Sequence, residues 1–260
     1  MIYTSGSGET LQPVIAGAAD AGVAVGTIGA IAAFAKGAPV RIIAAEATGA
    51  ADYWYAKASS PIKKLTDLTD KNTIAFSTRG SSTDSIVRAF IDEYKLKVKP
   101  ITTGNPSSTL TAVMTDQVDV GWASPPFGLD ALGEGKIRIV ARGNDLPAFK
   151  DQTIRLIVAN AGFLERRKDV AARFVQGYRD ALDWMYSEPA ALEAYAEFAK
   201  SSPEHAREVR DVFYPRDHLA VDFIKGLDTA MIDGIAFRYL AQPLTAQQLD
   251  SLFAIPAPIK

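Results

Sequence analysis

Small hydroxyl side chains gather in the stretch STRGSSTDSIVRAF, which covers residues 77–90 and follows the apolar run TIAF. From Ile86 onward the apolar residues recur at helical spacing, so the segment is predicted to be a strand, a turn and a helix. Ser81 and Asp84 have the S-x-x-D spacing of a helix cap. Such a turn offers free N–H groups at the positive end of a helix dipole, where an anion or polar ligand could bind. The alternative is that the hydroxyls only cap the helix.

A repeat divides the chain. Residues 2–24 match residues 101–123 at a constant offset of 99, with 8 identities in 23 positions, where about one or two would occur by chance. Each copy predicts a strand end, a turn rich in Gly and Ser, a helix and another strand. The match comes either from duplication or from a shared α/β pattern. Both explanations predict two similar α/β units, each with a small-residue turn at the carboxyl end of a strand.

Further turns of this kind follow other predicted strands, at Gly26 and Thr27 and at residues 123–126. Alternation of strands with helices of about ten residues predicts mostly parallel sheets flanked by helices. Open α/β sheets bind ligands outside the carboxyl ends of their strands. Two lobes facing each other would therefore form a ligand-binding cleft lined by turns from both.

The character of the sequence changes after residue 160, where long amphipathic helices begin. This tail has enough apolar surface to pack back on the first lobe. We expect the chain to cross between lobes near residues 58–61 and 158–161. Lobe 1 would then comprise residues 1–57 and 161–260, and lobe 2 residues 58–160. Two crossings allow closure about a hinge.

Composition excludes several classes of protein and site. The formal net charge is −2, which argues against a general nucleic-acid binder. Cysteine is absent, so disulfides, thiolate metal sites and cysteine nucleophiles are excluded. The two histidines, His205 and His218, stand in the tail without metal-ligand spacing, and the chain has no G-x-S-x-G elbow or full dinucleotide motif. No metal or cofactor is expected, no apolar run is long enough to span a bilayer, and no signal peptide opens the chain.

Aromatic residues give a further indication of a ligand site. Trp122 ends a predicted strand, where it could face the cleft or join the core with Val118 and Val120. Of the rings in ADYWYAK, Tyr53 among them, alternation predicts at least one toward the cleft. Rings beside several helix N-termini suit a small organic molecule with an anionic or polar group. Arg79 could add a positive charge, although a turn arginine is more often solvated.

These segments together resemble a known family. The order GSGETL, AGAADAGVAVGT, SPIKKLTDLTDKNTIAFSTRGSSTDSIVRAF and TLTAVMTDQVDVGWASPPFGLDAL is similar to substrate-binding proteins of ABC importers in the sulfonate, taurine, nitrate and thiamine-precursor group. The most specific segment is KLTDLTDKNTIAFSTRGSST. The resemblance implies the type II periplasmic-binding-protein fold, with a ligand enclosed between two lobes.

The function implied by the resemblance is the extracytoplasmic capture of a small anionic organic solute, such as an alkyl or aryl sulfonate, by hinge closure. The implied partner is an ABC-transporter permease, with no nucleic acid, and the protein would be a periplasmic monomer. The resemblance implies ligand contacts from a set of turn residues, and the aromatic residues add Tyr53. The set implied by the resemblance is Ser7, Gly8, Gly26, Thr27, Ser77, Thr78, Gly80, Ser81, Ser82, Thr83, Trp122, Ser124 and Pro125.

One departure from the family, one excluded branch and one alternative function accompany this resemblance. Family members begin with a signal peptide, a strand and a helix ahead of the point matched by Met1, so lobe 1 is expected to be shortened. An enzymatic branch of the superfamily carries a cysteine-rich motif, which is absent here. The alternative function is an enzyme acting on a small aromatic acid on the same scaffold, with Glu9 and Asp84 as the available acid and base.

Overall fold

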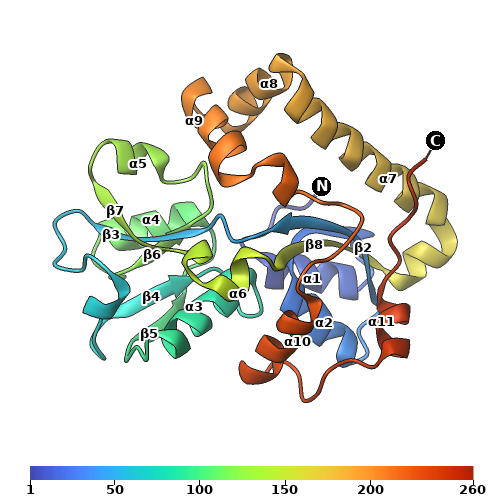
Figure 1. Ribbon diagram of the computed structural model, residues 1–260, viewed down its shortest axis with the longest axis horizontal. Helices are drawn as coiled ribbons and strands as arrows, with labels where there is room; N and C mark the ends of the chain where they lie inside the picture. The colour runs from blue at the N-terminus through green and yellow to red at the C-terminus, as the bar shows by residue number, and fades with distance from the viewer. Residues whose placement is uncertain (260) are drawn as a thin grey trace.

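Two lobes make up the protein, and each is an α/β unit with helices packed on its strands (Figure 1). The computed structural model describes residues 1–259. No helix within this range is both long and apolar enough to cross a membrane.

The sheet of lobe 1 has three strands in the order β1-β8-β2. Its strands are β1 (Ala21–Gly26), β2 (Val40–Thr48) and β8 (Thr153–Asn160). Successive side chains of β2 enter different cores: Ile42 packs on one face and Ile43 on the other. The first face is covered by α1 (Ser7–Ile15), α2 (Thr27–Ala35), α10 (Leu227–Ala236) and α11 (Ala246–Leu252), and the second by α7 (Ala161–Ser187). The sheet is therefore buried on both faces.

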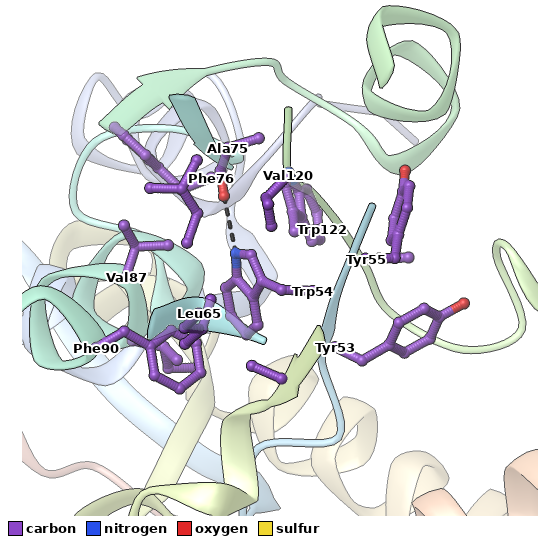
Figure 2. Close-up of a cluster of buried hydrophobic side chains, with 14 of the residues drawn as sticks. Tyr53, Trp54, Tyr55, Leu65, Ala75, Phe76, Val87, Phe90, Val120 and Trp122 are labelled. Carbon is purple, nitrogen blue, oxygen red and sulfur yellow. Dashed lines mark hydrogen bonds between the residues drawn. The ribbon is translucent and has the colours of Figure 1, made fainter. Parts of the chain in front are cut away.

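Lobe 2 is built around the aromatic strand β3 (Tyr53–Lys57). Its strands form a sheet in the order β6-β3-β7 and a pair β4-β5, joined where Ala75 N–H donates to Val120 O at 2.8 Å. The indole of Trp54 donates to Ala75 O at 2.9 Å and meets the ring of Phe90 edge-on (Figure 2). The other elements are η1 (Leu65–Asp67), β4 (Thr73–Phe76), α3 (Ser82–Glu93), β5 (Lys99–Thr102), α4 (Pro106–Met114), β6 (Gly121–Ala123), α5 (Leu129–Gly133), β7 (Ile137–Arg142), η2 (Gly143–Asp145) and α6 (Pro147–Lys150).

Strand direction differs in detail from the expected mostly parallel arrangement. The ladders β1-β8, β2-β8, β3-β6 and β3-β7 are antiparallel, and the β4-β5 ladder is parallel. The reason is that β3 and β8, which adjoin the crossings between lobes, each insert at the centre of a sheet and run against both neighbours. The sequence reveals apolar strands but does not reveal which ones insert in this way.

The helical tail covers more than lobe 1. Helices α7, α10 and α11 pack on lobe 1, as expected. The chain then continues through α8 (Pro189–Ala199), α9 (Pro203–Glu208), the π-helical turn η3 (Val209–Phe213) and η4 (Arg216–His218). Val209 belongs to the core of lobe 2, and the ring of Phe213 lies 6.5 Å from that of Tyr53. The tail therefore bridges both lobes.

The strand ladders locate the crossings between the lobes. Strand β3 pairs within lobe 2 and β8 within lobe 1, and the segments between the two sheets are residues 49–52 and 143–152. The two segments touch each other, because Gly143 N–H donates to Asp52 O at 2.9 Å and Gly49 N–H to Gln152 O at 2.9 Å. We propose domain boundaries at these segments, with residues 53–57 in lobe 2 and residues 153–160 in lobe 1.

The repeat at an offset of 99 corresponds to a repeated local structure. Thr4 and Thr10 share a hydroxyl hydrogen bond of 2.6 Å, and Thr103 and Thr109, each 99 positions later, share another of 2.6 Å. In both copies a glycine, Gly22 or Gly121, lies where a Cβ would crowd the valine of the preceding helix. The identities between copies thus maintain the same helix-to-strand contact in each lobe.

Candidate functional site

The hydroxyl-rich turn before α3 is organised as a helix cap. Ser81 Oγ accepts from Asp84 N–H at 3.1 Å, and Thr83 Oγ1 lies 2.9 Å from the hydroxyls of both Ser77 and Ser81. The Asp84 carboxylate accepts from Gly80 N–H at 2.9 Å. The three hydroxyls of residues 77, 81 and 83 are buried and hydrogen-bonded to one another. This geometry matches the capping alternative considered from the sequence.

Lobe 1 lies directly against this turn. A Cβ at Gly26 would fall 2.9 Å from Ser82 N, and a Cβ at Gly29 would overlap the carbonyl oxygen of Gly80. The hydroxyl of Thr27 is directed elsewhere and donates to Thr153 O at 2.6 Å. Residues 26, 27 and 82 line a space of only about 10 Å³. The turn at Gly26 and Thr27 therefore lies directly against the turn at residues 80–82, with little open space between these two turns.

Four other expected residues, Ser7, Gly8, Thr78 and Gly80, line a wide groove between the lobes with a volume of about 1080 Å³. Gly8 N–H donates to Thr78 Oγ1 at 3.1 Å, which joins α1 to lobe 2. Arg79 lines the same groove. Much of its wall is aliphatic, from α1, α2 and β5. This volume exceeds that of a typical small-ligand pocket, which is about 300–1000 Å³.

Three expected residues lie in or beside the core of lobe 2. Tyr53 and Trp122 are buried, as are the neighbouring rings of β3 (Figure 2), so none of these rings is exposed as alternation suggested. The hydroxyl of Tyr53 donates to Phe127 O at 2.5 Å. Pro125 begins a cis Pro125–Pro126 pair after β6. The structure thus supports the core alternative for Trp122.

Ser124, the remaining expected residue, belongs to a buried charged cluster. Its hydroxyl donates to the carboxylate of Asp52 and lies 3.0 Å from Nη2 of Arg155. The same guanidinium nitrogen lies 2.6 Å from Asp52 Oδ1, and Nη1 donates to the Tyr214 hydroxyl at 3.2 Å. Burial opposes the charge on Arg155, but the carboxylate of Asp52 raises the arginine pKa above its ordinary value. The cluster joins the first crossing, strand β8 of lobe 1, lobe 2 and the tail at one point.

Arg155 opens onto a cavity of about 320 Å³, here named the tyrosine cavity. Glu46, Ala47 and Arg155 form its floor on the sheet of lobe 1, and the tail forms its walls. The wall residues are Tyr178, Met185, Tyr186, Tyr195, Val209, Arg210, Tyr214 and Leu219. Its size and its mixture of rings and a few charged groups are those of a small-molecule site.

Glu46 is the other charged group on the floor of the tyrosine cavity. Its Oε2 accepts from Ala24 N–H at 2.7 Å. Desolvation raises the pKa of Glu46 to about 7, against the opposing effects of that hydrogen bond and of Arg155. Burial also raises the pKa values of Tyr178 and Tyr214, and that of Tyr195 to about 12, so these phenols are neutral at physiological pH.

Sequence reasoning missed the central residues of this cavity. Arg155 is a single arginine in the apolar strand TIRLIVAN, and Glu46 is a single acid in the apolar strand RIIAAEAT. Each is a charge inside a run predicted to be buried, which is a usable signal for a functional site. Asp52 had no such signal, because it lies in a crossing whose position was expected several residues later.

Known proteins similar to this chain share its fold. The model of the family described as NMT1/THI5 like matches residues 1–192, whereas no curated protein matches the chain in sequence. The periplasmic aliphatic sulphonate-binding protein SsuA from Escherichia coli has a TM-score of 0.68 and 21% identity, covering 98% of this chain and 82% of that one. The alkanesulfonate-binding protein SsuA from Xanthomonas axonopodis pv. citri, bound to MOPS, has a TM-score of 0.69 and 18% identity, with coverages of 95% and 77%.

The periplasmic nitrate-binding protein NrtA from Synechocystis PCC 6803 has a TM-score of 0.70 and 13% identity, covering 95% of this chain and 75% of that one. These likenesses confirm the two-lobed periplasmic-binding-protein fold expected from the sequence. Because the family model spans well over half of the residues, the chain belongs to the NMT1/THI5-like family.

Proposed function

We propose that this protein captures a small anionic organic solute, such as an alkyl or aryl sulfonate, and delivers it to the permease of an ABC importer. The family match and the sulfonate- and nitrate-binding proteins that share the fold support a solute-binding role. They are periplasmic proteins, which supports the same location for this chain. We propose that it acts as a monomer and is not an enzyme.

The observation that carries this proposal is the Arg155 cluster at the floor of the tyrosine cavity. It places a guanidinium, which suits a planar or tetrahedral oxyanion, at the junction of both crossings. Ser124 of lobe 2 reaches the same guanidinium. A solute bound here would lie beside the hinge, against lobe 1 and against a tail segment whose residues pack on lobe 2.

Hinge closure gives the binding step its mechanism. A solute that contacts both lobes has a higher affinity for the closed form and shifts the population toward it. The contact of Gly26 and Gly29 with the turn at residues 80–82 would be the surface that closes. We therefore propose that the expected turn residues, 77–83 among them, define the closed form, while Arg155 and the tyrosines contact the solute.

The enzyme alternative has weaker support in the geometry. Asp84 is engaged by Gly80 N–H, Arg88 and Tyr239, and Glu9 accepts from Ser5 N–H at 2.9 Å. The several partners of Asp84 leave that carboxylate little freedom to act as a general acid or base. Glu46 is the group that such an enzyme could use, so the test below includes a search for turnover.

Isothermal titration calorimetry of the full chain tests the proposal. We would titrate propanesulfonate, 4-ethylbenzenesulfonate, 2-aminoethanesulfonate, 4-(aminomethyl)benzenesulfonate and nitrate, and examine each mixture for products by mass spectrometry. We expect saturable binding of at least one sulfonate without any product. Binding of none of them, or conversion of one, would contradict the proposal.

Variants locate the site. Arg155→Met should abolish binding. Ser124→Ala keeps the buried ion pair and should weaken binding, so it tests the site even where the Arg155→Met protein fails to fold. Arg173→Met changes an exposed arginine of α7 and serves as the control. Equal affinity of Ser124→Ala and Arg155→Met with the control would exclude the tyrosine cavity as the site.

A further inference from the structure

We propose that Glu46 determines specificity in the tyrosine cavity by accepting a hydrogen bond from a cationic donor group of the solute, so that aminated solutes are preferred over matched solutes without the amine. This inference rests on the proposed function, since it concerns the same cavity. It identifies Glu46 as a binding residue and adds a second chemical group to the solute.

The first step is that the positive charges at the cavity already have partners. Arg155 is paired with Asp52, whose side chain is fully buried, at 2.6 Å. Arg210 is paired with Asp211 at 2.7 Å. Each guanidinium is therefore largely neutralised before any solute enters, although the remaining N–H groups of Arg155 can still orient an anionic group.

The second step is that Glu46 has no cation of its own. Among the described residues no lysine, arginine or histidine lies within ion-pair distance of its carboxylate, and Oε2 accepts a hydrogen bond from Ala24 N–H. Arg155, the nearest contributor of positive charge, lowers the pKa of Glu46 less than desolvation raises it, leaving it at about 7. A half-buried carboxylate without a counter-ion is costly, and a donor on a bound solute would offset that cost.

The third step concerns the rings around Glu46. Tyr178 and Tyr186 come from α7, Tyr195 from α8, and Tyr214 follows η3. The negative charge of Glu46 is among the causes, after burial, that raise the pKa of Tyr178, which places that phenol within electrostatic range of the carboxylate. Neutral phenol faces attract an ammonium group and do not attract an anion. The rings and the carboxylate therefore favour the same kind of group.

These charges give opposite pH dependences for two classes of solute. Between about pH 6 and about pH 8 an aliphatic amine stays protonated and a sulfonate stays ionised, while Glu46 titrates. Ionised Glu46 attracts an ammonium group and repels an unaccompanied anion; protonated Glu46 does neither. Affinity for an aminated solute should rise with pH, and affinity for a plain sulfonate should fall.

Other groups that could titrate near Glu46 can be separated from it. Arg155 from β8, Arg210 from η3 and the four tyrosines keep one protonation state over this range. Asp52 is the ion-pair partner of Arg155, and Arg155 connects it to the cavity floor. His218 lies against Gly49, three residues after Glu46 in the chain, so His218→Gln must be measured in parallel.

The experiment compares 2-aminoethanesulfonate with propanesulfonate, which has a methyl group in place of the ammonium, by calorimetry at about pH 6 and about pH 8. Because Glu46, with a pKa of about 7, is mostly protonated at the lower pH and mostly ionised at the higher, we expect the aminated solute to bind up to about tenfold more tightly at the higher pH than at the lower, a difference of about 1.4 kcal/mol. In Glu46→Gln, which keeps an acceptor for Ala24 N–H, the preference and its pH dependence should disappear. Glu193→Gln, an exposed glutamate of α8, and His218→Gln should retain both.

The outcomes separate this inference from the proposed function. Equal affinity for both solutes in the native protein, or a preference that survives in Glu46→Gln, would overturn the role of Glu46 while leaving solute binding intact. Failure of every sulfonate to bind would overturn the proposed function and this inference with it.

Discussion

Arg155 and Asp52 form a buried ion pair, with Nη2 and Oδ1 2.6 Å apart, that connects the first crossing between the lobes to strand β8 of lobe 1. Asp52 ends the first crossing and Arg155 follows the second. The Asp52 side chain is fully buried and that of Arg155 is 17% exposed. This ion pair adds to the backbone hydrogen bonds that join the two crossings, and its guanidinium also lines the tyrosine cavity.

Asp52→Asn should destabilise the protein strongly. It leaves Arg155 buried without its counter-ion, a change that costs about 3 to 5 kcal/mol when one partner of a buried pair is removed. Urea unfolding followed by circular dichroism measures the loss. Asp169→Asn is the matched control, because it removes an exposed pair with Arg173 on α7 and should cost less than about 1 kcal/mol. Similar losses in the two variants would mean that the Arg155 pair has no special role in stability.

Glu46 should make stability fall as pH rises. Its pKa in the folded protein is about 7, above its ordinary value of 4.5. Between these values the unfolded chain releases the proton while the folded protein retains it, so rising pH favours the unfolded state. The total effect is at most about 3 kcal/mol at one pKa unit per 1.36 kcal/mol.

Urea unfolding of the native protein and Glu46→Gln between about pH 4.5 and about pH 7 tests this without any solute. The stability difference between the two proteins should grow in favour of the glutamine variant as pH rises. A constant difference across the range would show that Glu46 titrates normally in the folded state.

Gly29→Ala should separate the lobes. A Cβ at this position overlaps the carbonyl oxygen of Gly80 in lobe 2, so the closed contact must open or distort. We expect a larger radius of gyration in small-angle scattering and weaker solute binding. Gly177→Ala in α7 has no neighbouring atom within 4 Å of the added Cβ, and should instead stabilise the helix by about 0.5 to 1 kcal/mol. An unchanged radius in Gly29→Ala would contradict the proposed closing surface.

Ser81→Ala should weaken the cap of α3. The change removes the acceptor for Asp84 N–H, which typically costs about 1 kcal/mol, and leaves the Thr83 hydroxyl with one hydroxyl partner fewer. Thermal unfolding measures this loss. Ser107→Ala, at an exposed position in the first turn of α4, should have little effect. If sulfonate affinity fell far more than stability in Ser81→Ala, the turn would contact the solute after all.

Local patterns in the sequence predicted local structure well. The S-x-x-D cap appears at Ser81 and Asp84, and the repeat at an offset of 99 predicted two similar units. The structure adds that each unit has a pair of hydrogen-bonded hydroxyls, Thr4 with Thr10 and Thr103 with Thr109. These features depend on residues within about ten positions of one another, so their spacing alone specifies them.

The direction of the central strands and the location of the proposed site depended on contacts between distant residues. Strands β3 and β8 run antiparallel to their neighbours because of where the crossings leave each lobe, and hydrophobic periodicity is the same for either direction. The tail residue Tyr214 reaches Arg155 across 59 positions, and Ser124 and Asp52 reach it from lobe 2 and the first crossing.

The sequence by itself determined the two α/β units, their repeated turns and the helical tail, because each follows from residue types at short spacing. Only the tertiary structure decided that Gly26 and Gly29 of lobe 1 lie against the turn at residues 80–82, and that Glu46 and Arg155 line the same cavity. A charge in an apolar strand reveals that it needs a partner, but the identity of that partner is set by how distant segments pack together.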